Sequence, residues 1–245
     1  MEVIPVIDLK DGVVVHARAG RRERYAPISS QLCADSTPLG IVHALLDVHA
    51  FATLYVADLD AIEGRGDHAA EIAAIARAFP RLALWVDCGL SNAQACHDWR
   101  QREIATPVIG TETLADAAAL RDFTKALEPH SWVLSLDYRG DRLLGGAVLQ
   151  DTIAHSPARV IVMTLARVGS DAGPDLERID EIRALGGGRK IYAAGGVRGG
   201  ADLKVLAERG VSGAFVATAL HDGRLGRAGI AAAASGPASF RSDRS

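Results

Sequence analysis

The sequence predicts one α/β domain, a TIM (β/α)8 barrel built from two duplicated half-barrels, with an enlarged first βα loop. Short apolar runs typical of buried parallel strands alternate with segments of helical periodicity. Two of these runs, at residues 3–8 and 132–137, each end in an aspartate. Matching motifs recur at separations of 106 or 107 residues, and the chain length of 245 residues agrees with the roughly 250 typical of such barrels.

Eight strands and eight helices are expected in alternating order, as a parallel barrel requires. The strands are expected near residues 3–8, 53–58, 82–87, 107–110, 131–137, 159–164, 190–194 and 213–217. The helices, which are rich in Ala and Leu, are expected near residues 38–49, 67–79, 91–101, 113–127, 150–155, 175–185, 200–209 and 224–234. The barrel is therefore predicted to span residues 1–234, and the segment 235–245 has the composition of a disordered tail.

The two halves of the chain match motif by motif. L-Y-V-A-D, which ends at Asp58, corresponds to V-I-V-M-T, which ends at Thr164. C-G-L corresponds to G-G-V, and V-I-G-T corresponds to F-V-A-T. Generic α/β periodicity would give such similar separations only by chance, so we interpret them as an internal duplication. Only the first unit departs, because about twenty extra residues follow the first strand.

The enlarged loop after the first strand is rich in arginine. Residues 12–17 are expected to form a short hairpin arm. Arg18, Arg21, Arg22 and Arg24 then place four guanidinium groups within seven residues. Such a run is either a solvated surface loop or a mobile cover that brings cations to an anionic substrate, and its position in a barrel favours the cover. On that interpretation the first three of these arginines bind the substrate.

Asp8 and Asp137 end strands that should face each other across the barrel axis, because each begins one of two matching half-barrels. Two carboxylates would then overlook one pocket from opposite sides. A pair of this kind suits general acid/base catalysis, in which one group donates a proton and the other accepts one. We predict that both are catalytic residues.

A phosphate site is predicted after the seventh and eighth strands. The run A-A-G-G-V-R-G-G contains Gly195 and Gly196, where the backbone can approach a ligand closely and turn amides can bind an anion. Ala217 and Thr218 follow the eighth strand and would complete a site where barrels commonly bind phosphate. A tight turn without a ligand is the alternative interpretation of the paired glycines.

The matching position in the first half carries Asp87 and Cys88 in place of small neutral residues. A carboxylate beside a phosphate is strongly repelled in a pocket of low dielectric constant, which disfavours a second phosphate here. Asp87 either adds a third carboxylate to the rim, as a substrate-binding residue, or caps the following helix. Cys88 is predicted to be a small buried residue rather than a nucleophile, because no adjacent histidine would activate it.

Three other polar residues follow or end strands. Of Asp58 and Asp60, one is expected to point into the pocket and the other toward the helices, and Asp58 is our candidate for substrate binding. Thr164 ends the sixth strand, where it either hydrogen-bonds a substrate or intermediate or packs its methyl group.

The composition argues against several classes of partner. A net charge of −3 and a pI near 6.2 disfavour nucleic acid, which needs a basic surface. Three cysteines without metal-site spacing predict a reduced, cytoplasmic protein, and no apolar run is long enough to span a membrane. The histidines lack metal-ligand spacing. We therefore expect a small phosphorylated substrate, no metal, no cofactor, and a monomer or homodimer.

Several motifs together resemble the HisA/HisF family of histidine biosynthesis. These are I-P-V-I-D-L-K-D-G-V-V-V, L-Y-V-A-D-L-D-A, V-I-G-T, L-S-L-D, A-A-G-G-V and V-A-T-A-L. The family comprises an isomerase and a cyclase that act on a doubly phosphorylated ribose derivative. The resemblance implies that Asp8 is the base, Asp137 the acid, and Thr164 an assisting residue.

The chain departs from the family pattern at substrate contacts. D-C-G-L-S replaces a glycine-rich turn, Leu165 replaces an acidic residue, V-G-S-D-A-G replaces an Asp-Gly-Thr turn, and Ala217 replaces glycine. We therefore predict HisA-like isomerase or lyase chemistry on an altered sugar-like or heterocyclic substrate. The run V-V-V-H-A-R-A-G-R-R-E-R-Y resembles a branch associated with one-carbon cofactor biosynthesis. The alternatives are the family's ordinary isomerase and a non-catalytic ligand-binding barrel.

Overall fold

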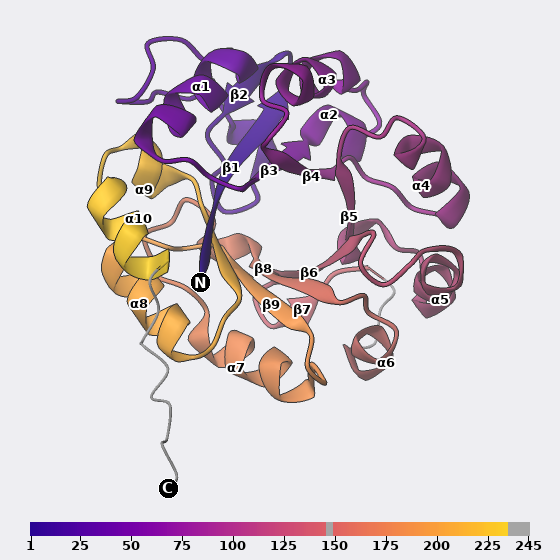
Figure 1. Ribbon diagram of the computed structural model, residues 1–245. Helices are drawn as coiled ribbons and strands as arrows, with labels where there is room; N and C mark the ends of the chain where they lie inside the picture. Colours follow the sequence, from indigo (N-terminus) through magenta and orange to yellow (C-terminus); the bar gives the residue numbers. More distant parts are fainter. Residues whose placement is uncertain (146–148, 235–245) are drawn as a thin grey trace, which may run out of the picture.

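Eight parallel strands close into a barrel, which confirms the predicted fold class. The computed structural model describes residues 1–145 and 149–234, and the tail predicted at 235–245 lies outside the described residues. The barrel strands are β1 (Glu2–Lys10), β3 (Thr53–Asp58), β4 (Ala83–Asp87), β5 (Thr106–Gly110), β6 (Val133–Arg139), β8 (Arg159–Thr164), β9 (Lys190–Ala194) and β10 (Gly213–Val216). Each pairs with the next in parallel, and β10 pairs with β1 to close the ring shown in Figure 1.

Helices surround this ring and connect its strands. The main helices are α1 (Pro38–Val48), α3 (Ala69–Ala78), α4 (Ala93–Arg100), α5 (Ala117–Ala126), α6 (Leu149–Ala154), α7 (Leu176–Leu185), α8 (Gly200–Glu208) and α10 (Arg227–Ala234). Each lies where the sequence predicts a helix. Two one-turn helices, α2 (Leu59–Ile62) and α9 (Thr218–His221), are additions that the sequence analysis did not predict. None of the described helices has the length and apolar character needed to cross a membrane.

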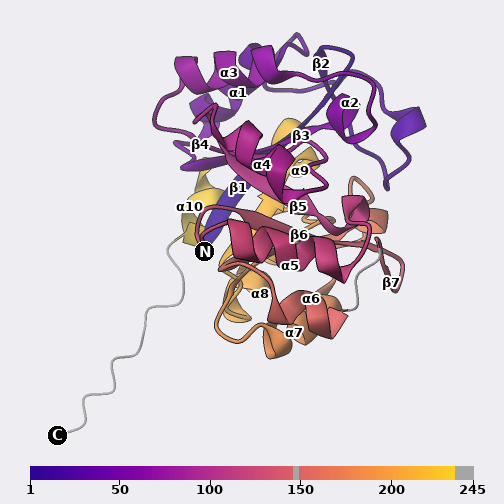
Figure 2. The ribbon, with the colours of Figure 1, turned by 90° about the vertical axis from the view of Figure 1, so that its right-hand side faces the viewer.

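Both strands that carry the predicted catalytic aspartates continue into a short hairpin. β2 (Val13–Val15) pairs with β1 in antiparallel register, with Asp8 opposite Val15, which confirms the predicted hairpin arm. β7 (Arg142–Leu143) pairs with β6 in the same way, and the sequence analysis did not predict it. In the side view of Figure 2, β7 lies at the opposite end of the barrel from the N-terminus.

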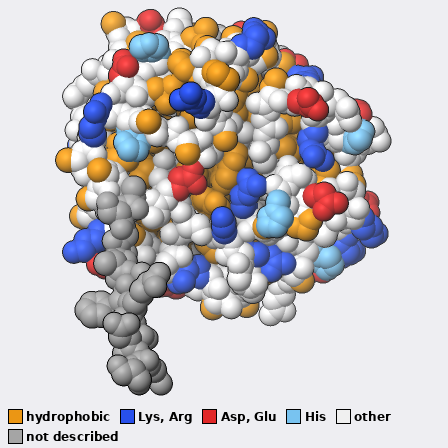
Figure 3. Space-filling model, in the orientation of Figure 1, with side chains coloured by type: hydrophobic (Ala, Val, Ile, Leu, Met, Phe, Trp, Pro, Cys, Tyr) orange, Lys and Arg blue, Asp and Glu red, His pale blue; other side chains and the backbone are white. Residues whose placement is uncertain are grey.

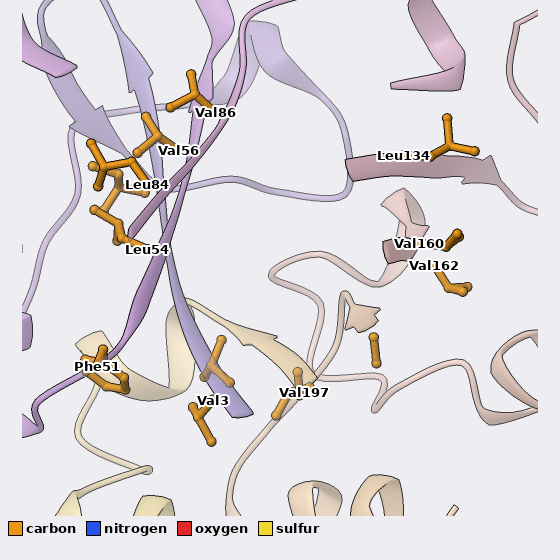
Figure 4. Close-up of a cluster of buried hydrophobic side chains, with 14 of the residues drawn as sticks. Val3, Phe51, Leu54, Val56, Leu84, Val86, Leu134, Val160, Val162 and Val197 are labelled. Carbon is orange, nitrogen blue, oxygen red and sulfur yellow. The ribbon is translucent and has the colours of Figure 1, made fainter. Parts of the chain in front are cut away.

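Alternating side chains of the strands build two layers of hydrophobic core. Outward-facing residues pack against the helices, and Figure 4 shows examples from three strands, Leu54, Val56, Leu84, Val86, Val160 and Val162. Inward-facing residues fill the barrel itself, where aromatic rings dominate. Trp85 contacts Tyr192 edge-on and Tyr55 contacts Phe215, each pair with ring centroids 4.9 Å apart. These rings fill the barrel interior below the carboxyl ends of the strands.

Charged side chains are dispersed over the face of the molecule shown in Figure 3. Groups of both signs lie on the part of this face that the described residues form, and several Lys or Arg side chains lie near one another at its lower right.

Candidate active site

One pocket opens at the carboxyl ends of the barrel strands. It encloses about 1020 Å³, counted out to its open mouth. Of the residues that the sequence analysis selected for the site, those lining it are Asp8, Arg22, Asp87, Asp137, Gly195, Gly196, Ala217 and Thr218. The structure thus brings both predicted catalytic aspartates and the predicted phosphate turn into one cavity, at the end of the barrel where barrel enzymes hold their active sites.

Asp137 lies at the end of β6, where hydrogen bonds fix its carboxyl group. The Ser135 hydroxyl donates to Oδ1 at 2.7 Å, and the Glu112 amide donates to Oδ2 at 3.2 Å. Burial raises the pKa of Asp137 to about 8, and the negative charges of Asp87 and Glu112 add to the rise. Asp137 is therefore suited to hold a proton at neutral pH.

Asp8 lines the same pocket from β1, in a different electrostatic setting. Burial raises its pKa to about 7, but the guanidinium of Arg22 opposes that rise. Within the described chain, no hydrogen bond reaches the Asp8 carboxylate, so it is free to contact a ligand. A cation thus favours the ionised form of Asp8, whereas the charges near Asp137 disfavour its ionised form.

Arg22 reaches from the enlarged loop to the first half of the barrel. It belongs to a 3-10 turn (Arg22–Arg24) and forms an ion pair with Glu112, which follows β5. The Lys10 amine also donates to the Arg22 carbonyl at 3.0 Å. Burial disfavours the charged guanidinium, but Glu112, and the charges of Asp87 and Glu63, outweigh it and raise the pKa of Arg22.

The other predicted loop arginines do not reach the pocket. Arg18 and Arg21 are exposed and are absent from its lining, so the prediction that they bind the substrate is not supported by their positions. The physical reason lies in the loop conformation, because only Arg22 turns inward. Arg139, at the end of β6, lines the pocket instead and was missed.

Asp58 does not face the pocket, which corrects our expectation for this residue. Its carboxylate accepts hydrogen bonds from the backbone amide of His68 at 2.7 Å, the His68 ring Nδ1 at 2.8 Å and the Ala61 amide at 3.1 Å. Asp60 also lies outside the pocket, paired with Arg65. Alternation along β3 explains this, because Ala57 faces the pocket and its neighbour Asp58 must face the helices.

Thr164 shows the same orientation in the second half. Its hydroxyl donates to Asp175 Oδ2 at 3.1 Å, and Asp175 caps the N-terminus of α7. Met163, one residue earlier in β8, lines the pocket. Asp58 and Thr164 thus occupy matching outward positions, and the assisting role of Thr164 stays a prediction.

Asp87 supplies a third carboxylate to the rim. Its Oδ1 accepts the Gly89 amide at 3.1 Å, while Asn92 caps α4, so Asp87 is not the cap of that helix. Burial raises the pKa of Asp87 to about 7, and the charge of Glu112 adds to the rise. The neighbouring Cys88 is half-buried, and burial raises the pKa of its thiol, so it does not form a thiolate readily.

Gly110 separates the carboxylates of Asp87 and Asp137. A Cβ atom at this glycine would lie 2.8 Å from Asp137 Oδ2 and 3.2 Å from Asp87 Oδ2. The two oxygens are therefore no farther apart than the sum of these distances. Two acids this close in a buried pocket do not both ionise readily, which agrees with their raised pKa values.

The turn after β9 has the features of the predicted phosphate site. Gly195 and Gly196 have φ values of +102° and +85°, and a Cβ at Gly196 would lie 2.2 Å from the Gly173 carbonyl oxygen. The turn is therefore tight, which also agrees with the alternative interpretation of the paired glycines as a tight turn without a ligand. Gly195, Gly196 and Val197 line the pocket, and the amides of Gly196 and Val197 donate to no backbone carbonyl of the described residues.

Glu112 is the main site residue that the sequence analysis missed. It follows the V-I-G-T motif, and the 107-residue repeat pairs it with Ala219. A position-by-position comparison of the two halves would therefore have found it as a second added carboxylate. Among residues 1–145 and 149–234, no group of three or more His, Cys, Asp or Glu side chains is placed to hold a metal ion.

Comparisons with known proteins agree on one family. A family model described as histidine biosynthesis protein matches residues 2–226. A Rubrobacter xylanophilus protein named 1-(5-phosphoribosyl)-5-((5-phosphoribosylamino)methylideneamino) imidazole-4-carboxamide isomerase is 34% identical, over 96% of this chain and 97% of its own length. The Deinococcus radiodurans protein of the same name is 28% identical, over 91% and 95%. An uncharacterized protein of Methanocaldococcus jannaschii is 29% identical, over 92% and 95%.

Proposed function

The chain belongs to the histidine biosynthesis protein family, and we propose that it is an acid/base isomerase whose substrate differs from that of the named isomerases. Relatives with an isomerase name cover nearly the whole chain, which supports isomerase-type activity. The proposed substrate is a small phosphorylated molecule, either sugar-like or heterocyclic. The observation that carries the proposal is that Asp8 and Asp137 share one pocket and have neighbours of opposite charge.

Asp8 is the proposed base and Asp137 the proposed acid. Arg22 favours the ionised form of Asp8, whereas Asp87 and Glu112 disfavour ionisation of Asp137. In an isomerisation, Asp137 would protonate a ring oxygen while Asp8 removes a carbon-bound proton. Two carboxyl groups whose environments separate their pKa values are the arrangement that such chemistry uses.

The proposed change of substrate rests on the first-half rim. Asp87 and Glu112 lie where a second phosphate would meet two carboxylates, and Arg22 is already paired with one of them. The proposed ligand therefore carries its phosphate at the Gly195–Gly196 turn, with Thr218 beside it. A precursor in one-carbon cofactor biosynthesis belongs to this class of candidates, on the resemblance of the loop sequence alone.

Replacement of the two aspartates tests the acid/base roles. Asp8→Asn and Asp137→Asn should each lower turnover by about 10²- to 10⁴-fold, because each removes one proton-transfer group. Binding of inorganic phosphate and the circular dichroism spectrum should stay as in the wild type. Unchanged turnover in both variants would sink the proposal and favour a non-catalytic binding barrel.

Complementation tests the choice of substrate. The gene should fail to restore growth of a histidine auxotroph that lacks the isomerase, whereas the gene for the Rubrobacter xylanophilus relative should restore it as a positive control. Growth with this chain would show that it uses the ordinary substrate of the named isomerases. That result would overturn the altered substrate but not the acid/base roles.

A further inference from the structure

A buried histidine, His68, joins Asp58 to the turn of the first hairpin. Its ring Nδ1 lies 2.8 Å from Asp58 Oδ1, and a carboxylate only accepts, so Nδ1 carries the hydrogen. The other ring nitrogen, Nε2, is therefore an acceptor, and the Gly12 amide donates to it at 2.9 Å. His68 and Asp58 are 4% and 1% exposed, and neither lines the pocket. The proposed acid/base chemistry does not use this pair.

The turn of this hairpin is attached at both of its residues. Asp11 and Gly12 join β1 to β2 with φ values of +50° and +80°, which is typical of Asp-Gly hairpin turns. The Asp11 amide donates to Asp60 Oδ2 at 2.8 Å, beside the bond from Gly12 to His68. Buried Val14 anchors the strand that follows the turn. Side chains that follow β3 thus hold the tip of the hairpin, while the core holds its base.

The second hairpin lacks this attachment in the described part of the chain. Gly140 and Asp141 join β6 to β7 in a turn of the same length. Neither of their amides donates to a group of residues 1–145 or 149–234. The Asp141 carboxylate pairs with Arg178 but is fully exposed, and exposed ion pairs contribute little to stability. Of the two hairpins, the one that precedes the enlarged loop is therefore held by buried groups.

The attached turn lies next to the segment that supplies Arg22 to the pocket. Lys10, the residue before the turn, donates from Nζ to the Arg22 carbonyl at 3.0 Å. Arg22 lines the pocket, and its guanidinium favours the ionised form of Asp8. A two-stranded hairpin is marginally stable unless it packs against other elements. If the turn were released, Lys10 would move with it, and Arg22 would lose one of the contacts that set its position.

We propose that His68 is a positioning residue for the proposed reaction, because it holds Arg22 beside Asp8. His68 fixes the hairpin through the Gly12 amide, and the hairpin acts on Arg22 through Lys10. The inference rests on the proposed role of Asp8 as the base. Burial raises the pKa of Asp8, and the Arg22 guanidinium opposes that rise, so a displaced Arg22 leaves the base less ionised. The histidine thus contributes to the reaction without touching the ligand.

Two amide side chains separate the positioning role from a purely structural one. The amide of Gln reaches the place of Nε2, so His68→Gln keeps an acceptor for the Gly12 amide. The amide of Asn reaches only the place of Nδ1, so His68→Asn keeps a donor to Asp58 but loses that acceptor. Asp58→Asn retains an oxygen that accepts from Nδ1 and should leave the hairpin attached. We expect His68→Asn alone to release the hairpin, whereas a role confined to the contact with Asp58 would make His68→Gln the damaging variant.

Amide hydrogen exchange, measured by NMR, reports the release of the hairpin. The His16 and Ile28 amides donate to backbone carbonyls at 2.9 Å within the arm that the hairpin forms. In His68→Asn they should exchange about tenfold faster or more, because the turn loses a buried acceptor. In His68→Gln they should stay within about threefold of the wild type. Ser156→Ala is the matched control, since it removes a buried hydrogen bond to the Ile153 carbonyl just before β8 and should leave these amides unchanged.

Titration of the Asp8 carboxyl, followed by NMR of its carbon, gives the reading that a purely structural role would not change. In His68→Asn the titration should move to higher pH, because the guanidinium of Arg22 no longer favours the ionised form as strongly. His68→Gln and Ser156→Ala should titrate as the wild type does. Faster exchange of the hairpin with an unmoved Asp8 titration would overturn the positioning role. Wild-type behaviour of His68→Asn in both readings would overturn it as well, and so would equal effects of His68→Asn and His68→Gln.

Lys10→Met decides the question if His68→Asn fails to fold. This substitution removes the donor to the Arg22 carbonyl and leaves the buried histidine in place. The Arg24 amide, which donates within the loop, should then exchange about tenfold faster, and an unchanged rate contradicts the proposal. None of these readings needs a substrate. Failure of the proposed function would appear in the turnover of the two aspartate variants and is therefore distinguishable from a failure of the positioning role.

Discussion

The two halves of the barrel share the same order of strands and helices, but the side chains at their rims differ in charge. Asp87 and Glu112 line the pocket in the first half. The 107-residue repeat places Ala194 and Ala219 at the matching positions of the second half. One rim therefore has two carboxylates, and the other has small neutral side chains and turn amides that donate to no backbone carbonyl of the described residues. The duplication sets the positions, while a few side chains decide which end of a ligand each half accepts.

This asymmetry also gives the two aspartates, Asp8 and Asp137, different electrostatic environments. Asp8 and Asp137 occupy the same place in their half-barrels, at the end of a strand that continues into a hairpin. Arg22 lies near the first, and the two rim carboxylates lie near the second. The cation favours ionisation of Asp8 and the carboxylates disfavour ionisation of Asp137, which supports the proposed base and acid roles.

The largest expected effect comes from removing the space between the two acids. Gly110→Ala would place a methyl group 2.8 Å from Asp137 Oδ2, so the carboxyl group must move. We expect turnover to fall by about 100-fold or more, because small misplacements of catalytic groups are costly. The free energy of unfolding should fall by about 1–3 kcal/mol through overpacking. Steady-state kinetics and chemical denaturation measure the two effects.

The matching residue of the second half provides the control. Ala217 already carries the methyl group that Gly110 lacks. Ala217→Gly should change turnover by less than about tenfold, because no carboxylate pair is displaced there. Equal losses in the two variants would break the comparison between the halves, since both rims would then be equally sensitive to packing.

The next effect is a pH dependence of stability that originates in the three buried aspartates of the pocket, Asp8, Asp87 and Asp137. The folded-state pKa values of Asp8 and Asp87 are about 7 and that of Asp137 is about 8, all raised by burial. Between about pH 4 and 8 the folded protein therefore keeps protons that the unfolded chain has released. Its free energy of unfolding should fall as pH rises through this range, by up to about 1.4 kcal/mol per pH unit for each group.

Denaturation between pH 5 and 8 measures this slope. Asp87→Asn should make it shallower, because it removes one titrating group and also lowers the pKa of Asp137. Asp122→Asn, at an exposed carboxylate on α5, should leave it unchanged. A slope that is the same in Asp87→Asn and the wild type would contradict the assignment of raised pKa values to the first-half rim.

The fold could be predicted from the sequence because its signals are local. Apolar runs, helical periodicity and the repeat separation identify the strands and their order, and the inward-facing Asp8 and Asp137 follow from the duplication. The short hairpin β7 and the one-turn helices α2 and α9 have too few residues to produce a periodic pattern. They matter for the site because α9 begins with Thr218, which lines the pocket.

The orientation of polar residues at strand ends could not be predicted. Strands of a parallel barrel are buried on both faces, so V-I-V-M-T and L-Y-V-A-D do not distinguish inward from outward positions. Loop residues are equally ambiguous, because which of the loop arginines turns inward depends on contacts with Glu112 across the pocket. The missing information is long-range in both cases.

The smallest expected effect tests the outward pair that the two halves have in common. Thr164→Val removes the hydroxyl that donates to Asp175 and should lower the free energy of unfolding by about 1 kcal/mol. Turnover should stay within about twofold, since the lost hydrogen bond lies outside the pocket. Asp58→Asn, at the matching first-half position, should likewise affect stability rather than turnover, because His68 loses its carboxylate partner.

If Thr164→Val instead lowers turnover more than about tenfold at unchanged stability, the hydroxyl must reach the ligand during the reaction. The second half would then contribute a catalytic group that the first half lacks, and the two halves would differ in chemistry as well as in charge.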